Sequence, residues 1–305
     1  MRIVFMGTPQ IAADCLEYIC QHHEVAAVFC QPDKPVGRKQ ILTPPPVKQL
    51  ALSKGIPVYQ PRGFKNGIAT EQIRELAPDL IAVIAYGRIL PQECLDIPRY
   101  GCINIHGSLL PKHRGSAPIQ RSLMAGDIKT GLTAMKMNAG MDTGDIISVL
   151  PVELSEDDNA DSVFARMGKL SGPFLDEVIG ALENGSAVFT AQDNDQATYA
   201  PPIEKSEGTF SFDNSSSEIV NKVRGLSMWP NAVFVCGGKR VKVRSASCSE
   251  LSGTPGEILS VDPLIIAASE GSVVLRQVVP EGSREMNGKE WAMGRRFRKG
   301  DQIRP

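Results

Sequence analysis

Short runs of apolar and β-branched residues alternate with helical stretches through the first half of the chain, and this alternation is the strongest constraint on its fold. The runs lie at residues 2–6, 24–30, 79–85 and 101–105. Strands that alternate with helices are typical of a parallel sheet, because a crossover helix returns the chain to the edge from which the next parallel strand starts. We therefore predict an α/β fold whose first domain is Rossmann-like, with a mostly parallel sheet.

The second half has a different pattern. One helix is predicted near residues 217–224, and short strands are predicted after it, at residues 232–236, 239–245, 264–268 and 272–278. Short strands at regular spacing are typical of a small β-barrel. We therefore expect a second, smaller domain of β structure.

The boundary between the two domains is predicted from composition. A long helix is expected over residues 158–182, and the polar and Pro-containing residues that follow indicate a connecting segment rather than packed structure. The predicted parts are a Rossmann-like catalytic domain at 1–189, a linker at 190–205 and a C-terminal β-barrel at 206–305.

The first loop argues against a dinucleotide site. Gly7, Thr8 and Pro9 do not form a Gly-x-Gly-x-x-Gly fingerprint. Thr8 as a helix cap, with Pro9 at the first helical position, explains the loop without a nucleotide.

Composition indicates an ordinary soluble chain. The 305 residues are 42% hydrophobic and carry a formal net charge of −1. The overall charge therefore does not indicate a nucleic-acid partner. Residues 206–305 nevertheless hold 14 Lys and Arg against 11 Asp and Glu. Four of these cations surround Phe297, which fits a surface that follows phosphates, although a solvated basic end is an equal alternative.

The start of the chain and the pattern of its cysteines predict the cellular compartment of the protein. The first predicted strand begins at Arg2, which leaves no room for a targeting segment, and no apolar run reaches the roughly 20 residues that span a bilayer. The seven cysteines form no short-spaced pairs. We expect buried free thiols, a cytoplasmic protein with no membrane partner, and no metal site.

Asn104 and His106 are the first candidates for chemistry. They lie on one face of the strand predicted at 101–105, where it gives way to a Gly-containing loop. An imidazole transfers protons near neutral pH, and an amide can donate to a carbonyl oxygen that becomes negative, so the pair suits acyl transfer. In an arbitrary Asn-x-His segment, an Asn that satisfies the loop and a His that ends the strand are the commoner explanation.

A family resemblance favours the catalytic interpretation. Residues 102–120 have the sequence CINIHGSLLPKHRGSAPIQ. This segment resembles the signature of folate-dependent formyltransferases, and the similarity extends from MRIVFMGTP at 1–9 to the basic carboxyl end. Within that family the chain is most similar to members that formylate methionine on charged initiator tRNA. The resemblance implies N10-formyltetrahydrofolate as co-substrate, an OB-like barrel as second domain, and a monomer.

The resemblance also implies a catalytic trio of Asn104, His106 and Asp142. Asp142 in its Gly-flanked segment is otherwise a typical turn residue, and Asp145 is a local competitor for its role. Asn104 and a protonated His106 would stabilise the oxyanion of a tetrahedral intermediate, and the Asp142 carboxylate would favour the imidazolium.

Two segments are expected to line the folate pocket. The first follows the buried strand at 79–85 and the second follows His106; by themselves, both fit an ordinary connection or core packing. The isomer of the Leu110–Pro111 bond is left open by the sequence. The implied folate-binding residues are Tyr86, Gly87, Arg88, Ile89, Leu90, Ser108, Leu109, Leu110 and Pro111.

A Pro-rich loop with cations spans residues 31–46. Loops of this length are usually functional or disordered. By resemblance, Arg38 contacts the acceptor end of the tRNA, with Lys34 and Lys39 as supporting phosphate contacts. The alternative is that this loop is flexible and binds no partner.

The chain departs from the family pattern at Gln10 and Ile11, where an acidic residue and Phe are common. The catalytic positions are unaffected. Three other functions stay open. Formyl transfer to a sugar nucleotide or a glycinamide ribonucleotide would use the same trio, and a formyltetrahydrofolate hydrolase would use water in place of the amine. A protein that binds tRNA or folate without catalysis is disfavoured by the intact trio.

Overall fold

The computed structural model describes residues 1–37 and 39–304, which divide into two compact units. The first unit comprises 1–118, 129–153 and 164–201, and the second comprises 119–128, 154–163 and 202–305. Two short insertions of the first half therefore belong to the second unit, a detail that composition does not indicate.

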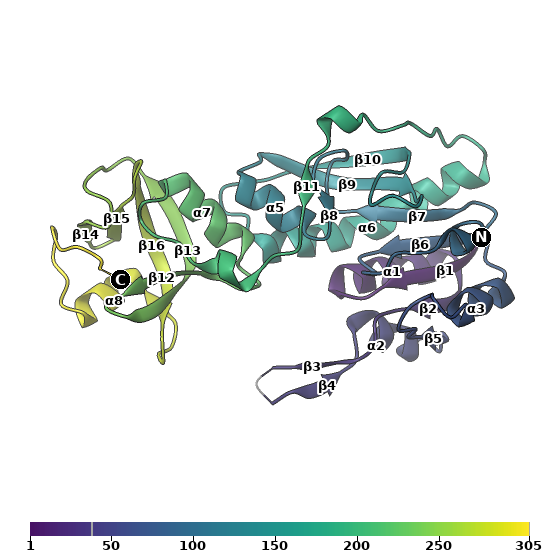
Figure 1. The fold of residues 1–305 in the computed structure, drawn as a ribbon, viewed down its shortest axis with the longest axis horizontal. Coiled ribbons are helices and arrows are strands. Elements are labelled where there is room, and N and C mark those ends of the chain that lie inside the picture. Colours follow the sequence, from purple (N-terminus) through teal and green to yellow (C-terminus); the bar gives the residue numbers. More distant parts are fainter. Residues whose placement is uncertain (38, 305) are drawn as a thin grey trace. The chain divides into compact units, whose positions relative to one another are not determined.

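The first unit is built on a sheet with strand order β10-β9-β7-β6-β1-β2-β5 (Figure 1). Neighbouring strands from β5 to β7 are parallel, and β9 and β10 add an antiparallel edge. This confirms the predicted Rossmann-like domain; the antiparallel pair was not predicted. The strands are β1 Arg2–Gly7, β2 Glu24–Phe29, β5 Val58–Tyr59, β6 Leu80–Ile84, β7 Cys102–His106, β9 Lys129–Lys136 and β10 Ile146–Glu153.

Helices connect these strands. They are α1 Gln10–His22, α2 Pro46–Ser53, α3 Ile68–Leu76, α4 Gln92–Leu95, α5 Pro118–Ala125 and α6 Ala160–Glu183. The predicted cap of α1 is wrong, because Pro9 occupies the cap position and no side chain caps the helix. Thr8 instead donates to the Tyr86 carbonyl and accepts from the Gln31 amide. Its hydroxyl thus ties the first loop to the loop after β6.

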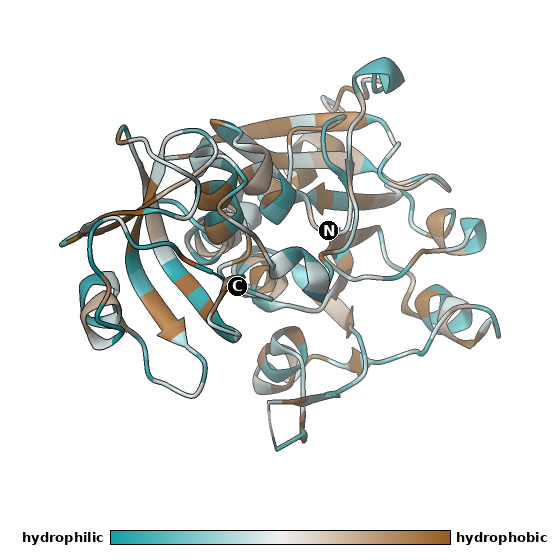
Figure 2. Cartoon of the chain, turned by 60° about the vertical axis from the view of Figure 1, so that its left-hand side comes forward, coloured by the Kyte–Doolittle hydropathy of each residue, from teal (hydrophilic) through white to brown (hydrophobic). Residues whose placement is uncertain are grey.

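The sheet of the first unit is buried at its centre. All of β6 and residues 3–6 of β1 are buried, as a strand between two parallel neighbours requires. In Figure 2 the apolar colour runs along strands, whereas hydrophilic residues gather in loops. Since each buried aliphatic side chain contributes about 1.5–3 kcal/mol, these strands hold β7, and the residues at its end, in place.

Residues 31–46 contain a hairpin of β3 Lys34–Val36 and β4 Ile41–Thr43. The loop predicted there is therefore partly strand. Lys34 and Lys39 are exposed on it. Arg38, the key tRNA contact in the sequence prediction, lies outside the described residues.

The segment after α6 packs against the first unit, so the expectation of an unpacked connection is wrong. The short strand β11 Tyr199–Ala200 pairs in parallel with β8 Arg114–Gly115, and Thr190 forms a bridge with Ile146. Gly115 has φ +125°, and a Cβ there would lie 2.5 Å from the Ala200 carbonyl oxygen. The 3-10 turn η1 Asn194–Gln196 lies between these contacts.

The second unit contains an antiparallel sheet of order β12-β13-β16-β15-β14, with β17 paired to β16. This confirms the predicted β domain. Its elements are η2 Lys205–Gly208, α7 Ser216–Gly225, β12 Ala232–Cys236, β13 Lys239–Ser249, β14 Ile258–Val261, β15 Leu264–Ala267, β16 Ser272–Pro280, β17 Met286–Asn287 and α8 Gly288–Gly294.

The aromatic ring of the basic tail is half-buried. Phe297 packs on the core of the second unit, with its ring 5.6 Å from that of Trp291. The four cations beside it are exposed. Any contact of this tail with phosphates therefore depends on charge rather than on stacking by Phe297.

Candidate active site

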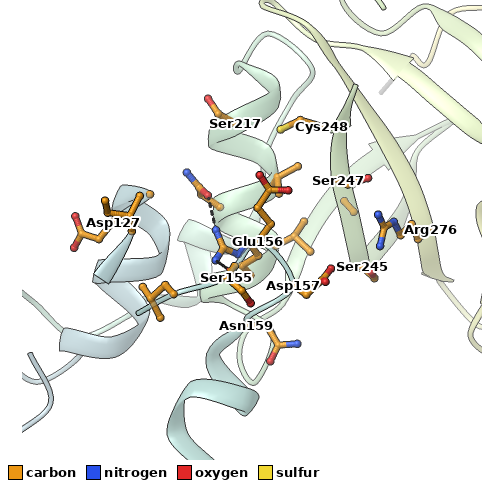
Figure 3. Close-up of a pocket in the computed structure, with 18 of the residues that line it drawn as sticks. Asp127, Ser155, Glu156, Asp157, Asn159, Ser217, Ser245, Ser247, Cys248 and Arg276 are labelled. Carbon is orange, nitrogen blue, oxygen red and sulfur yellow. Dashed lines mark hydrogen bonds between the residues drawn. The ribbon is translucent and has the colours of Figure 1, made fainter. Parts of the chain in front are cut away.

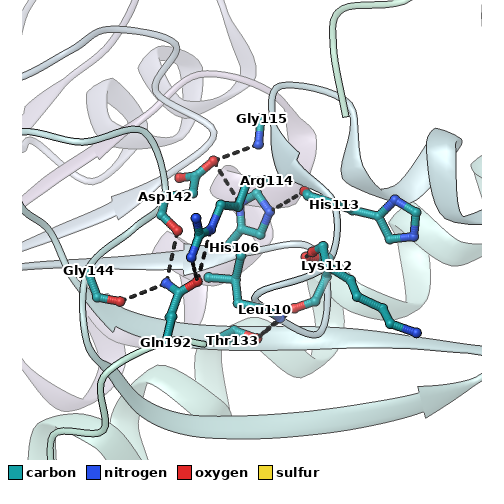
Figure 4. A network of polar contacts seen from close by, with 11 residues as sticks. His106, Leu110, Lys112, His113, Arg114, Gly115, Thr133, Asp142, Gly144 and Gln192 are labelled. Atoms are coloured by element: carbon teal, nitrogen blue, oxygen red, sulfur yellow. Dashed lines mark hydrogen bonds and ion pairs between the residues drawn. The ribbon is translucent and has the colours of Figure 1, made fainter. Parts of the chain in front are cut away.

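His106 and Asp142 come together although 36 positions separate them in the sequence. His106 is the last residue of β7 and is 5% exposed. Its Nδ1 lies 3.7 Å from Oδ2 of Asp142, whose side chain is 15% exposed. Figure 4 shows the two side chains facing each other at the end of the strand.

The loop that carries Asp142 is held closely against β9. Asp142 has φ +56°, in the left-handed region, and its Oδ2 accepts a 2.8 Å hydrogen bond from the Gly115 amide. A Cβ at Gly144 would lie 1.7 Å from the Lys136 carbonyl oxygen, so only glycine allows this approach. The Gly115 amide thus holds the Asp142 carboxylate directly, and the close approach of Gly144 to β9 holds the backbone of its loop.

The hydrogen bonds of His106 decide its tautomer. Nε2 lies 2.9 Å from the His113 carbonyl oxygen, and because a carbonyl only accepts, Nε2 carries a proton. Burial lowers the pKa of His106, while the Asp142 carboxylate opposes that shift. The neutral ring is therefore favoured, with an unprotonated Nδ1 towards Asp142. The imidazolium expected from the sequence belongs to the tetrahedral intermediate, whereas the resting ring is neutral because desolvation outweighs the carboxylate.

Asn104 lies two residues before His106 on β7, so both side chains leave the same face of the sheet. It pairs with Val83 and Met135 and is half-buried. Within residues 1–37 and 39–304, its amide forms no hydrogen bond with His106 or Asp142. The structure therefore brings His106 and Asp142 together and places Asn104 beside them on the strand. Asp145, the competitor, is exposed just before β10, and its carbonyl oxygen accepts a 2.9 Å hydrogen bond from the Lys136 amide.

The segment predicted as the second folate wall forms a tight turn after His106. Ser108 is fully buried; its hydroxyl donates to the Lys112 carbonyl, and its own carbonyl accepts from Thr133. Leu110 donates to the Thr133 hydroxyl at 3.2 Å. The Leu110–Pro111 bond is cis.

The first predicted folate wall, residues 86–90, combines buried polar atoms with an exposed apolar side chain. Tyr86 Oη and Arg88 Nε are buried without a hydrogen-bond partner in the described part of the chain. Burial raises the pKa of Tyr86 to about 12, so its hydroxyl stays a donor. Ile89 is 84% exposed, whereas Leu90 is buried.

Gln192 is a site residue that sequence reasoning missed. Its Nε2 donates to the carbonyl oxygens of Asp142 at 2.9 Å and Gly144 at 2.7 Å. Its Oε1 accepts from the buried Arg114. No local signal distinguishes this glutamine from its polar neighbours, since its role depends on a contact 50 residues away.

Metal catalysis and attack by a cysteine thiol have less support in the structure. Among the described residues, no group of three or more His, Cys, Asp and Glu could hold a metal ion. Burial raises the pKa of Cys102, on the same strand as His106, to about 12, so this thiol is not a ready nucleophile. No helix in the described chain has the length and apolar character needed to cross a bilayer.

A cavity of about 370 Å³ in the second unit is separate from this site (Figure 3). Its walls come from α7, β13 and residues 126–128 and 154–159. Arg224 on its wall donates to the carbonyl oxygens of Asp158 and Ser155. Residues of both charge signs line it, so it presents no surface of a single sign to a ligand.

Comparison with known proteins agrees with the geometry. Residues 1–179 match the formyl transferase family and residues 202–296 match the formyl transferase C-terminal domain. A methionyl-tRNA formyltransferase of Acetivibrio thermocellus is 42% identical over 309 residues, covering 99% of each chain. One of Trichlorobacter lovleyi is 40% identical, covering 100% of this chain and 97% of its own.

The fold is also found in a solved structure. WlaRD, a sugar 3N-formyl transferase, superposes with a TM-score of 0.70 at 18% identity, over 93% of this chain and 99% of its own. At this identity the likeness concerns the fold alone. From the family matches and the full-length relatives, we conclude that the chain belongs to the methionyl-tRNA formyltransferase family.

Proposed function

We propose that this protein transfers the formyl group of N10-formyltetrahydrofolate to the α-amino group of methionyl initiator tRNA, for translation initiation. The observation that carries the proposal is the buried approach of His106 Nδ1 to Asp142 within 3.7 Å. Support for the substrate comes from full-length relatives, about 40% identical, that are named methionyl-tRNA formyltransferases.

The reaction needs a neutral amine and a stabilised oxyanion. The amine nitrogen attacks the formyl carbon and forms a C–N bond; the bond from that carbon to N10 of the folate then breaks. The proton lost by the amine passes to N10, which leaves as tetrahydrofolate. A base, an oxyanion donor and a proton carrier are thus required.

The neutral His106 is suited to act as the base. Nε2–H is engaged by His113, so Nδ1 is the atom that accepts the amine proton. The Asp142 carboxylate, 3.7 Å away, stabilises the imidazolium that results. The charged ring can then donate to the oxyanion and return the proton to N10. We propose the Asn104 amide as the second oxyanion donor, because it leaves the same face of β7.

Residues 86–90 and 108–111 offer groups that are suited to binding a folate. The protonated Tyr86 hydroxyl and Arg88 Nε offer buried donors that the described chain leaves unpaired, and a pterin ring carries acceptors for them. Exposed Ile89 and the turn from Ser108 to Pro111 offer apolar walls. We assign residues 86–90 and 108–111 to folate binding.

The cations of the hairpin and of the second unit suit the tRNA. We propose Lys34, Lys39 and Arg38 as phosphate contacts, with further contacts from the β domain, which has more cations than anions over 206–305. We place the enzyme in the cytoplasm as a monomer, with a catalytic domain at 1–189 and a tRNA-contacting domain at 206–305.

The test compares acceptors. Formyl transfer is measured with charged initiator tRNA, free methionine, a sugar nucleotide, glycinamide ribonucleotide and water. We expect transfer to the charged tRNA at a kcat/KM far above the rest. A preference for a small amine or for water would replace the proposal with a sugar nucleotide or ribonucleotide formyltransferase, or with a hydrolase.

A further inference from the structure

One segment of the first unit contacts the backbone of Asp142 directly and is linked to His106 through the backbone of His113. This segment, residues 192–200, is called the brace below. At one end, Gln192 Nε2 donates to the carbonyl oxygens of Asp142 and Gly144, at 2.9 and 2.7 Å. At the other, the Thr198 hydroxyl accepts from the His113 amide at 2.9 Å. The His113 carbonyl in turn accepts from His106.

The orientation of the Gln192 amide is determined by Arg114. Nε and Nη2 of Arg114 donate to Gln192 Oε1 at 3.0 and 2.7 Å. A guanidinium has no acceptor, so Oε1 must face it and the NH2 group must face the loop carbonyls. Arg114 is 2% exposed, and Nη2 also donates to the Asn194 amide oxygen at 2.9 Å. Figure 4 shows Arg114 and Gln192 beside Asp142 and His106.

The loop that Gln192 holds needs an external restraint. Asp142 adopts φ +56°, in the left-handed region that is unfavourable for a non-glycine residue. In this conformation its carboxylate faces His106, and Oδ2 also accepts from the Gly115 amide. Hydrogen bonds to the carbonyls of Asp142 and Gly144 offset this conformational cost.

We propose that Gln192, oriented by Arg114, is a positioning residue that holds the Asp142 carboxylate against His106. It acts through the backbone of the acidic loop and accepts no proton itself. The inference rests on the proposed function, in that it assigns Gln192 a share in the turnover that Asp142 and His106 support. Its geometric part, the hold on Asp142, can be tested without turnover.

Two variants separate positioning from packing. Gln192→Leu removes both the donor and the acceptor. Gln192→Glu keeps the shape and the partner of Arg114 but sets an oxygen against two carbonyl oxygens. The matched control is Gln196→Glu, four positions along, where the side chain is exposed and bonds only locally to Asp193. Urea unfolding shows that each variant is folded.

The readouts are steady-state kinetics and an NMR titration of the His106 ring. Both Gln192 variants are expected to lower kcat by about tenfold to a hundredfold, with KM for both substrates unchanged. The titratable groups that act on His106 are Asp142 and His113, and Asp142 raises its pKa. The His106 midpoint in Gln192→Leu is therefore expected below that of the wild type, in the direction of Asp142→Asn.

The outcomes are distinct. Reduced kcat in both variants, with a lowered His106 midpoint in Gln192→Leu and wild-type behaviour of Gln196→Glu, supports the inference. A wild-type kcat in Gln192→Glu indicates packing alone and overturns it, as does a His106 midpoint that stays at the wild-type value. If the wild type fails to formylate charged tRNA, the proposed function fails, while the titration still decides whether Gln192 positions Asp142.

Discussion

His106 Nε2 donates a 2.9 Å hydrogen bond to the carbonyl oxygen of His113, seven residues further along the chain. His113 has φ +58°, so its carbonyl is turned back towards the end of β7. This bond engages Nε2, so in the proposed mechanism Nδ1 is the ring atom that exchanges a proton. A loop carbonyl would thus decide the direction of proton transfer.

Substitution of Asn104 or His106, the two proposed oxyanion donors, should reduce turnover without unfolding the protein. Loss of an oxyanion donor typically lowers turnover about a hundredfold to a thousandfold, so we expect falls of that order for Asn104→Ala and His106→Ala. Single-turnover formylation of charged tRNA measures them, with circular dichroism as the folding control. Wild-type turnover in either variant would refute its assignment.

Stability should depend on pH through His106. Its pKa is lowered in the folded state, so between the unfolded value of about 6.5 and the folded value the unfolded chain binds more protons. The free energy of unfolding therefore falls as the pH drops through this window and is fully retained above it. Urea unfolding between pH 7.5 and about 5 measures the slope. His106→Gln should flatten it, and His22→Gln, at an exposed position, should not.

Gly144→Ala should damage both stability and turnover. The added Cβ would lie 1.7 Å from the Lys136 carbonyl oxygen, and the resulting strain costs about 1–3 kcal/mol or moves Asp142 away from His106. Gly180→Ala in α6 is the control, since nothing lies within 4 Å of its Cβ. We expect it to stabilise the protein by about 0.4–1 kcal/mol. Equal unfolding midpoints for the two variants would contradict the close approach.

Tyr86→Phe should separate stability from folate use. The buried hydroxyl has no partner in the described chain, so its removal should raise the free energy of unfolding by about 1 kcal/mol. If the pterin accepts from this hydroxyl, the KM for the folate rises in the same variant. Tyr59→Phe serves as the comparison for both the free energy of unfolding and the folate KM. An unchanged folate KM would take Tyr86 out of the proposed pocket.

Charge removal on the hairpin should change the salt dependence of tRNA binding. Each phosphate contact that Arg38→Leu, Lys34→Gln or Lys39→Gln removes should reduce the slope of log K against log salt by about 0.7–0.9. Binding of charged tRNA across a salt series measures the slope. Lys65→Gln, an exposed lysine of another loop, is the control. An unchanged slope in the three variants would argue against hairpin contacts.

The sequence was sufficient for the four central parallel strands β1, β2, β6 and β7 and for the family. Buried runs such as Leu80–Ile84 carry their own signal, because a strand between two parallel neighbours must be apolar on both faces. The placement of His106 at a strand end followed from the same pattern. The antiparallel pair β9 and β10 was missed, since its edge strand is only partly buried and its alternation is weak.

Tertiary structure decided the protonation and support of the site. The lowered pKa of His106 arises from burial under segments far apart in sequence. Gln192 and Thr198 lie in a polar stretch that composition marks as a connection, yet they bond to residues 50 and 85 positions away. Local sequence determines which residues can form a strand or a turn. Which partner a polar side chain finds depends on the folded chain, because a hydrogen bond requires only proximity and carries no periodic pattern.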